Sequence, residues 1–412
     1  MQLSALGDLI SSAVRDAGVA SLGLAVSGGG DSMALLHAAA GLDEVAVRAV
    51  TVDHGLRPEA REEAALVART CADLGVAHDI LTWDGWDNRG NLQGAAREAR
   101  YALMRDWADA HGVDAIALAH TRDDQAETVL MRLARKGGVD GLSAMSPVRR
   151  ADGITWLRPF LDVGRADLRA ALNGVGATWV EDPSNVDPRF DRIRVRGAMD
   201  QLADIGIDAA ALSAVARNMQ TARAALDAVT AEALRAQVTL IGGDVVIQRA
   251  GFAAQSSEIR RRMLLEALKW VASAAYGPRA SALGDLEATV MGGGRHTVHG
   301  CLIDADQTTI TIGREWNAIS GVTAGIGQVW DGRWVVSGPE NNGLSITGLG
   351  GVGWSRLRSE IEPNLPRQAA ITTPAVWSGT ELIAAPAAGW ANGYSARLNN
   401  AGNGPFSCII SH

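Results

Sequence analysis

The chain contains 412 residues, of which 47% are hydrophobic and 20% are charged, and its formal net charge is −8 at pH 7. A chain of this length is expected to form roughly two or three domains, and its acidic balance argues against a protein that coats nucleic acids. Cys71, Cys301 and Cys408 are too few and too scattered for a disulfide framework or a metal knuckle. Residues Met1–Gly18 match neither a signal peptide nor a membrane span, so we expect a cytoplasmic protein with no membrane partner.

Short β-rich runs alternate with helical runs in the first part of the chain. The predicted strands are Leu22–Ser27, Val47–Val52, Ala77–Trp83, Ala115–Ala119 and Ile154–Phe160. The helical patterns between them are Asp31–Ala40, Pro58–Leu74, Leu92–His111, Arg122–Leu133 and Arg165–Leu172. This alternation predicts an α/β domain with a doubly wound parallel sheet. Ligands of such sheets bind beyond the carboxyl ends of the strands, so the residues that leave each strand are the candidates for a site.

A glycine-rich turn, Ser27-Gly28-Gly29-Gly30-Asp31-Ser32, joins the first predicted strand to the next helix. Consecutive glycines let backbone N–H groups approach an anion, and the helix adds the positive end of its dipole. A Walker loop would need a lysine that is absent, and a dinucleotide fingerprint would need a small residue where Met33 stands. The turn therefore predicts a pyrophosphate site; the alternative is an ordinary strand-to-helix turn. Asp53, after the second strand, lies near the spacing of a ribose-binding acid.

An acidic helix start follows the fourth predicted strand, with the sequence His120-Thr121-Arg122-Asp123-Asp124-Gln125-Ala126-Glu127. Asp123, Asp124 and Glu127 are three or four positions apart, so they share one face of a helix. Capping is the alternative, because Thr121 and Asp124 have the spacing of a capping box and acids in a first turn complement the dipole. Capping explains the aspartates but neither His120 nor Glu127, so we expect these side chains to face the crevice at the glycine turn.

Basic residues gather downstream despite the acidic total. Residues 132–169 carry eight arginines and lysines against four aspartates, which favours contact with a polyanion. Arg135-Lys136-Gly137-Gly138 is a second glycine-rich turn, and it either holds phosphates or simply ends a helix. Arg192, Arg194 and Arg196 alternate; as a strand they would present three guanidinium groups on one face, and as a linker they would form a solvated basic run.

The rest of the chain changes character twice. Helical periodicity over Ala209–Ala236 and Glu258–Ala275 precedes strand-like runs over Thr297–Ile312, and the segment from Trp316 onward is rich in Gly, Asn, Pro and Trp. We predict a catalytic domain over residues 1–200, a mainly helical domain over 201–315 and a small β-rich domain over 316–412. The tryptophans of the last segment could stack on bases, but packing in the core of a small domain is favoured.

Several motifs together resemble one known family. The glycine turn resembles the PP-loop of ATP pyrophosphatases, which cleave ATP between its α and β phosphates. Within that superfamily, the chain is similar to the bacterial tRNA(Ile)-lysidine synthases in further motifs: Val52–Arg57, Ala96–Tyr101, Ala119–His120, Asp123–Thr128, Arg158–Leu161 and Trp179–Asn185. Their order carries the resemblance, since each alone would be weak. The chain departs from the family pattern at Thr121, where a second histidine is usual, at Lys136 and at Ile193.

The resemblance implies an adenine nucleotide alpha-hydrolase-like fold and ligation of L-lysine to C2 of the wobble cytidine of CAU-anticodon tRNA(Ile). The reaction would pass through an adenylated tRNA and convert ATP to AMP and diphosphate. ATP would bind through the glycine turn and the ribose-binding acid, that is, Ser27, Gly28, Gly29, Gly30, Asp31, Ser32 and Asp53. Asp31 would also hold Mg²⁺, His120 would contact the nucleotide, and Asp124 and Glu127 would receive the lysine.

The phosphates of tRNA are expected to meet a set of cations on the same domain: Arg97, Arg100, Arg135, Lys136, Arg192, Arg194 and Arg196. The sequence does not fix the oligomeric state, and a homodimer is one possibility. The rival enzymes are a tRNA cytidine thiolase, which typically needs a cysteine pair or an iron–sulfur cluster, and a small-molecule PP-loop ligase such as an NAD synthase. A regulator that binds ATP without turnover is the rival from another class, and the presence of Asp31, Asp124 and Glu127 argues against it.

Overall fold

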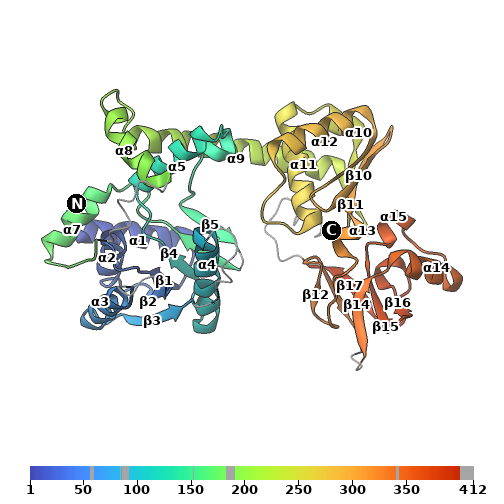
Figure 1. Ribbon diagram of the computed structural model, residues 1–412, viewed down its shortest axis with the longest axis horizontal. Helices are drawn as coiled ribbons and strands as arrows, with labels where there is room; N and C mark the ends of the chain where they lie inside the picture. Colours follow the sequence, from blue (N-terminus) through green and yellow to red (C-terminus); the bar gives the residue numbers. More distant parts are fainter. Residues whose placement is uncertain are drawn as a thin grey trace. The chain divides into compact units, whose positions relative to one another are not determined.

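The computed structural model describes residues 1–55, 60–83, 85, 92–151, 153–181, 191–339 and 343–399 (Figure 1). These residues form two compact units, Met1–Arg223 and Ala224–His412. Each unit is described by itself below, and the division into domains at residues 200 and 315 stays a prediction. The predicted motif residues 56–57 and 182–185, and Cys408, lie outside the described residues.

The first unit is built on one six-stranded sheet with the order β3-β2-β1-β4-β6-β5. Neighbouring strands are parallel from β3 through β6, and only β5 runs antiparallel, paired with β6. The doubly wound parallel sheet is therefore confirmed. Its strands are β1 (Ser21–Ala25), β2 (Ala46–Asp53), β3 (Ala77–Thr82), β4 (Ala115–Ala117), β5 (Val148–Ala151) and β6 (Ile154–Leu157).

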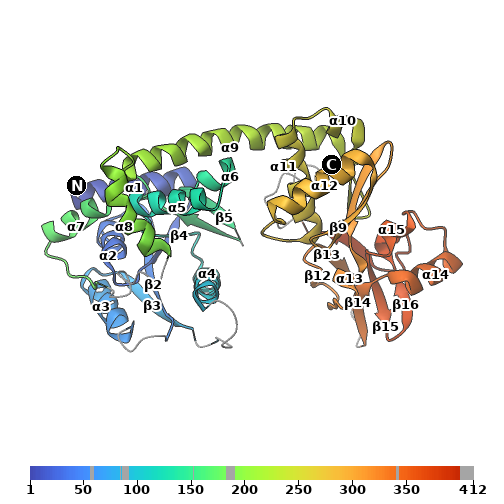
Figure 2. The ribbon, with the colours of Figure 1, turned by 45° about the horizontal axis from the view of Figure 1, so that its top comes forward.

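Helices cover both faces of this sheet. One face is buried by apolar residues such as Leu6, Leu35 and Leu168, contributed by α1 (Leu3–Ala17), α2 (Gly30–Ala39) and α7 (Arg165–Gly174), together with α3 (Ala60–Asp73). The opposite face packs against α4 (Leu92–His111) through Met104 and Trp107 (Figure 2). Because β1 and β4 are neighbours and their connections leave in opposite directions, the crevice at their carboxyl ends is the switch point of the sheet.

A helical layer continues this unit after β4. It comprises α5 (Arg122–Ala134), α6 (Val139–Leu142), α8 (Asp191–Ala203) and the first half of the long α9 (Ala209–Gln237), up to Arg223, with Ala126, Val129, Leu212 and Ala216 buried between them. The strand and linker interpretations of Arg192, Arg194 and Arg196 were both wrong, because these residues lie on α8. Helical spacing puts Arg192 and Arg196 on one side of α8, whereas an alternating strand would have aligned all three.

The second unit contains a five-stranded antiparallel sheet beside its helices, with the order β7-β8-β11-β10-β9. The strands are β7 (Val238–Ile241), β8 (Asp244–Gln248), β9 (Gly294–Val298), β10 (Cys301–Ala305) and β11 (Thr309–Arg314). The helices are α10 (Arg249–Ala253), α11 (Ser257–Ala272) and α12 (Ala280–Gly292). The segment 201–315 thus has more strand than expected, because β7 and β8 were not recognised in the sequence.

The residues after 315 form two small sheets, β12-β13-β17 and β14-β15-β16, as the β-rich prediction implied. Their strands are β12 (Val329–Trp330), β13 (Trp334–Ser337), β14 (Leu344–Gly348), β15 (Pro374–Ser378), β16 (Glu381–Ala384) and β17 (Ser395–Leu398). The helices here are α13 (Trp316–Ile319), α14 (Gly350–Glu360) and α15 (Arg367–Ala370), with a short turn, η2, over Pro386–Ala388. Trp330 and Trp334 are buried in the apolar core, as the packing interpretation predicted.

Cys71 and Cys301 are free and buried, and burial raises the pKa of their thiols to about 11 and about 12. Both therefore remain protonated at neutral pH. Within the part of the chain that is described, no helix has the length and apolar character that a membrane crossing requires.

Candidate active site

The glycine turn lies between β1 and the N-terminus of α2, as predicted. Gly28 has φ +87°, a backbone conformation that favours glycine, and a side chain at Gly30 would meet Trp179 at 3.3 Å. The hydroxyl of Ser32 accepts from the Ser27 amide at 3.1 Å and donates to the Gly29 carbonyl at 2.9 Å. Because the first N–H groups of α2 have no acceptor within the helix, the turn presents donors and a positive dipole end to an anion.

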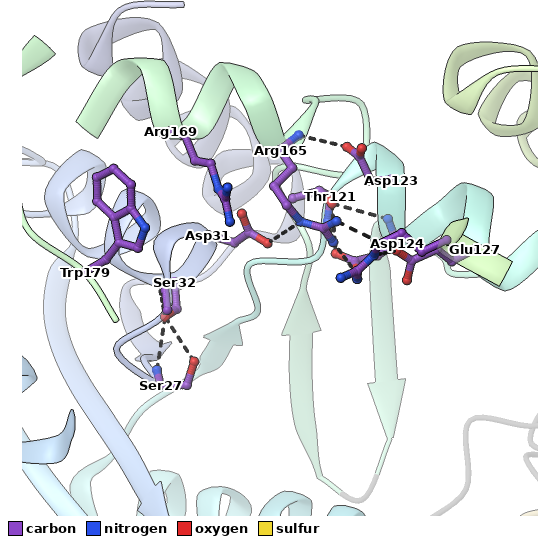
Figure 3. A network of polar contacts seen from close by, with 12 residues as sticks. Ser27, Asp31, Ser32, Thr121, Asp123, Asp124, Glu127, Arg165, Arg169 and Trp179 are labelled. Carbon is purple, nitrogen blue, oxygen red and sulfur yellow. Dashed lines mark hydrogen bonds and ion pairs between the residues drawn. The ribbon is translucent and has the colours of Figure 1, made fainter. Parts of the chain in front are cut away.

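Asp31, in the first turn of α2, faces the acidic helix through one arginine. Its Oδ2 accepts from Arg165 Nε at 3.2 Å, and Arg165 extends from there toward Asp124 (Figure 3). The other oxygen of Asp31, Oδ1, is buried and has no hydrogen-bond partner among the described residues. Burial raises the pKa of Asp31 above its ordinary value, although Arg165 opposes the shift.

Asp124 closes the capping box that its spacing predicted. Its Oδ2 accepts from the amide and the hydroxyl of Thr121 at 2.8 and 2.9 Å, so Thr121 caps α5. Its Oδ1 faces Arg165 Nη2 at 3.2 Å and Arg192 Nη2 at 3.7 Å. Burial pushes the pKa of Asp124 upward, but Arg165, Arg192 and the Thr121 amide together hold it below its ordinary value. Capping and charge pairing therefore occupy different oxygens of one carboxylate.

Glu127 is fully buried and meets three arginines. Arg192 Nε donates to its Oε2 at 2.7 Å and Arg196 Nε to its Oε1 at 2.9 Å, while Arg165 Nη1 lies 3.7 Å away. The carboxylates of Asp31, Asp124 and Glu127 are thus balanced by the guanidinium groups of Arg165, Arg192 and Arg196. Buried charges are stable only when they are paired with opposite charges. A cationic ligand must therefore share a carboxylate with an arginine or replace that arginine.

His120 leaves β4 beside this cluster. Burial, reinforced by Arg158, Arg192 and Arg100 and opposed by Asp124, lowers the pKa of its imidazole to about 3. Its Nδ1 is buried and has no hydrogen-bond partner among the residues that the structure describes. The imidazole is therefore neutral at physiological pH, and it can offer a hydrogen bond to a ligand without carrying a charge.

The remaining candidates fall into two groups. Asp53 ends β2, which is parallel to β1, so it lies at the same edge of the sheet as the glycine turn. Its carboxylate accepts from the Gly55 amide at 2.8 Å. Lys136, two residues after the end of α5, is in the left-handed region with φ +57°, and the Gly137 amide donates to the Arg132 carbonyl at 2.8 Å. The second glycine turn is therefore a helix C-terminus, and phosphate binding by this turn stays a prediction.

The cations proposed for tRNA differ in their partners. Arg192 and Arg196 contact Glu127, Arg194 is paired with Asp191, and Arg135 lies 3.6 Å from Asp191. Arg97 and Arg100, on α4, have no carboxylate within 4.0 Å among the described residues; their guanidinium carbons lie 5.2 and 5.7 Å from the centre of the Tyr101 ring. Lys136 likewise has no carboxylate within 4.0 Å in the described part of the chain, so these three cations can meet an anion without breaking an ion pair.

Sequence reasoning missed the role of Arg165, which connects Asp31 to Asp124. It appeared there only as one of many basic residues, although a cation in the first turn of a helix opposes the dipole and so signals nearby acids. The contact of Trp179 with Gly30 was also missed, since residues 149 positions apart come together only in the tertiary structure.

Comparison with known proteins agrees with this geometry. A family model for the PP-loop domain matches residues 5–202. The tRNA(Ile)-lysidine synthase of Ruegeria pomeroyi is 45% identical over 394 residues, which cover 95% of this chain and 94% of that protein. The chain belongs to the tRNA(Ile)-lysidine synthase family of PP-loop enzymes. It is accordingly an ATP-dependent ligase that modifies tRNA.

Other members of the lysidine synthase family match over shorter spans. The tRNA(Ile)-lysidine synthase of a Bradyrhizobium species is 43% identical over 267 residues, which cover 61% of this chain and 74% of that protein. Among solved structures, the U34-tRNA thiolase NcsA from Methanococcus maripaludis with its [4Fe-4S] cluster has a TM-score of 0.41 at 15% identity. That match covers 52% of this chain and 79% of the thiolase.

Proposed function

We propose that this chain attaches L-lysine to C2 of the wobble cytidine of CAU-anticodon tRNA(Ile) in two steps within one crevice. In the first, the C2 oxygen attacks the α-phosphorus of ATP and diphosphate leaves. In the second, the side-chain amine of lysine attacks C2, AMP leaves with the oxygen, and the amine loses a proton. The observation that supports this best is the convergence of Asp31, Asp124 and Glu127 on Arg165, because it puts a phosphate-binding turn beside a carboxylate pair suited to a cation.

The glycine turn would hold the phosphates of ATP. Backbone N–H groups of Gly28–Gly30 and the hydroxyls of Ser27 and Ser32 are the donors, and Asp53 would approach the ribose. The unpartnered Oδ1 of Asp31 fits Mg²⁺, since a carboxylate oxygen is the ligand type that this ion prefers. When bound, Mg²⁺ would neutralise charge on the phosphates, and Asp31 would hold it at the start of α2.

Asp124 and Glu127 would receive lysine. Both carboxylates lie in a low-dielectric crevice, where they attract an ammonium group strongly, and Arg165, Arg192 and Arg196 balance their charge until lysine arrives. Because the pKa of Asp124 is held low, this carboxylate suits charge pairing better than accepting a proton. We propose that one carboxylate of this pair accepts the proton that the lysine amine loses.

His120 would orient the reacting phosphate. Its imidazole is neutral, because burial holds its pKa far below physiological pH, so it can donate one hydrogen bond to a phosphate oxygen. Hydrogen bonds from Arg97, Arg100 and Lys136 would hold tRNA phosphates. The other proposed cations would first have to leave their acidic partners: Arg135, Arg192, Arg194 and Arg196. A cytoplasmic location and a homodimer stay predictions.

Two partial reactions test these roles. Glu127→Gln and Asp124→Asn should retain diphosphate release that depends on tRNA and ATP, but should consume lysine at least about 100-fold more slowly at low lysine concentration. Asp123→Asn is the matched control, since this neighbour accepts from the Arg165 amide rather than from a guanidinium. Normal lysine consumption by both variants would refute the assignment of the carboxylates.

A further inference from the structure

Three arginines lie around Tyr101 on α4. Arg97 and Arg100 come from α4, and Arg158 immediately follows β6. Trp156, two residues before Arg158 on the same side of β6, packs edge-on against the Tyr101 ring with centroids 4.6 Å apart. The side chain of Arg158 hydrogen-bonds Tyr101, and the guanidinium groups of Arg97 and Arg100 lie beside the Tyr101 ring. All three guanidinium groups therefore lie around one tyrosine.

These cations lack countercharges. No carboxylate among the described residues lies within 4.0 Å of Arg97, Arg100 or Arg158. The Nε atoms of Arg100 and Arg158 are buried and have no hydrogen-bond partner among those residues. Arg158 is only 6% exposed; its Nη1 donates to the Ser146 carbonyl at 2.8 Å, and its side chain also hydrogen-bonds Tyr101, a neutral partner.

Such an arrangement costs free energy in the unliganded protein. Burial and neighbouring cations lower the pKa of both Arg100 and Arg158. A buried guanidinium is normally paired with an acid, because removing its charge from water is unfavourable. An anionic ligand would supply both the missing charge and acceptors for the two Nε–H groups.

We propose that Arg158, together with Arg100 and Arg97, forms a site for one phosphodiester group of the RNA substrate. The site deepens the proposed function and rests on it. Exposure decreases from Arg97, which is exposed, through Arg100 to the buried Arg158, so a phosphate enters from the solvent side and ends against Arg158. Tyr101 holds Arg97 and Arg100 in place through its ring.

The position of the site favours RNA over the nucleotide. The glycine turn that suits the phosphates of ATP follows β1 and opens α2, which belongs to the apolar core on one face of the sheet. The arginines instead come from α4, on the other face, and from the end of β6, and two of them, Arg158 and Arg100, lower the pKa of His120 after β4. A phosphate bound here would anchor the backbone next to a base that enters the crevice between the two sets of groups.

Equilibrium binding of unmodified CAU-anticodon tRNA(Ile), without ATP or lysine, tests the site. Arg158→Gln should weaken tRNA binding about tenfold or more and lower the dependence of log K on log salt by about 0.7. ATP binding should be unchanged, and the melting temperature should not fall, because an unpaired buried charge has been removed. Arg105→Gln is the control on α4, since the Arg105 side chain is 42% exposed and is paired with Asp106 at 2.8 Å. Arg100→Gln provides the same test if Arg158→Gln does not fold.

Single neutral methylphosphonates on either side of the wobble cytidine locate the contact. At the contacted phosphate, the substitution should weaken binding to the unsubstituted protein but not to Arg158→Gln. Unchanged tRNA binding by the folded variant would overturn the site, and so would a loss of ATP affinity alone, which would assign the arginines to the nucleotide. Lysidine formation by the unsubstituted chain is measured in parallel, because its failure would refute the proposed function whatever the binding results show.

Discussion

Arg165 Nε lies 3.2 Å from Asp31 Oδ2, although 134 positions separate the two residues in the sequence. The same guanidinium group lies 3.2 Å from Asp124 and 3.7 Å from Glu127 (Figure 3). The phosphate-binding turn and the acidic helix therefore share one cation. Any ligand that draws Asp31 away from Arg165 changes the charge that Asp124 and Glu127 experience.

Replacing Arg165 should destabilise the first unit. Arg165→Gln leaves three carboxylates with two arginines, and breaking a buried pair in this way is expected to lower the free energy of unfolding by about 3 kcal/mol. Arg165→Lys should recover only part of this loss, because one ammonium group cannot span Asp31 and Asp124 as a guanidinium does. Urea denaturation measures both. Arg169→Gln is the control, since its pair with Glu181 is exposed and is worth at most about 1 kcal/mol.

Asp31→Asn should separate stability from activity. Burial raises the pKa of this carboxyl, so its ionised form is disfavoured in the folded state and its charge costs stability above the unfolded pKa. The free energy of unfolding of the variant at pH 7 should therefore be no lower than that of the unsubstituted protein. Its tRNA-dependent diphosphate release should fall at least about 100-fold. A clear fall in melting temperature together with retained diphosphate release would contradict this account of Asp31.

Acid should destabilise the protein before its carboxylates titrate. Burial lowers the pKa of His120 to about 3, whereas the unfolded chain binds this proton near its ordinary value of 6.5. The unfolded state therefore gains protons first, and His120 alone should cost about 2 kcal/mol of stability between pH 6.5 and pH 5. His37, His54 and His78, whose pKa values burial also lowers, add to the same trend. Denaturation over this range should show a flatter decline for His120→Gln; an unchanged slope would argue against a neutral buried imidazole.

Thr121 should contribute to folding more than to chemistry. Thr121→Ala removes the cap of α5 and should lower the free energy of unfolding by about 1 kcal/mol, whereas Thr121→Ser should retain most of it. Because Asp124 Oδ1 keeps its contact with Arg165, the maximal rate of lysine transfer should change by less than about threefold. Thermal unfolding and steady-state rates, measured on the same preparations, check both statements.

Much of the fold followed from local patterns in the sequence. Strand and helix periodicity around Leu22–Ala40 and Leu92–His111 predicted elements close to those observed, because amphipathic and buried patterns there agree with the parallel sheet. Short edge strands such as Val148–Ala151 were missed, since four residues are too few to show a period. Arg192 was placed wrongly because alternating charges suggested a strand, while the burial of Glu127 draws Arg192 and Arg196 to one side of α8.

The sequence singled out the candidate acids and glycines, and Arg192 and Arg196 as candidate cations, but it did not indicate the contacts of Arg165. Asp31, Asp124 and Glu127 stand out because carboxylates beside a glycine turn have few structural explanations. Arg165 does not stand out in the sequence, and Arg158 does so only as part of the motif Arg158–Leu161, since the surroundings of both side chains are set by the folded chain. Single-sequence patterns identify a ligand-binding edge more readily than the countercharges that tune it.

Mass analysis of the wobble nucleoside tests the central claim most directly. The full chain is incubated with ATP, Mg²⁺, isotope-labelled lysine and unmodified CAU-anticodon tRNA(Ile), and the tRNA is then digested to nucleosides. We expect the wobble cytidine to gain one labelled lysine with loss of water, and this product to require ATP. An unmodified cytidine, or a product that carries sulfur instead of lysine, would contradict the function proposed for this chain.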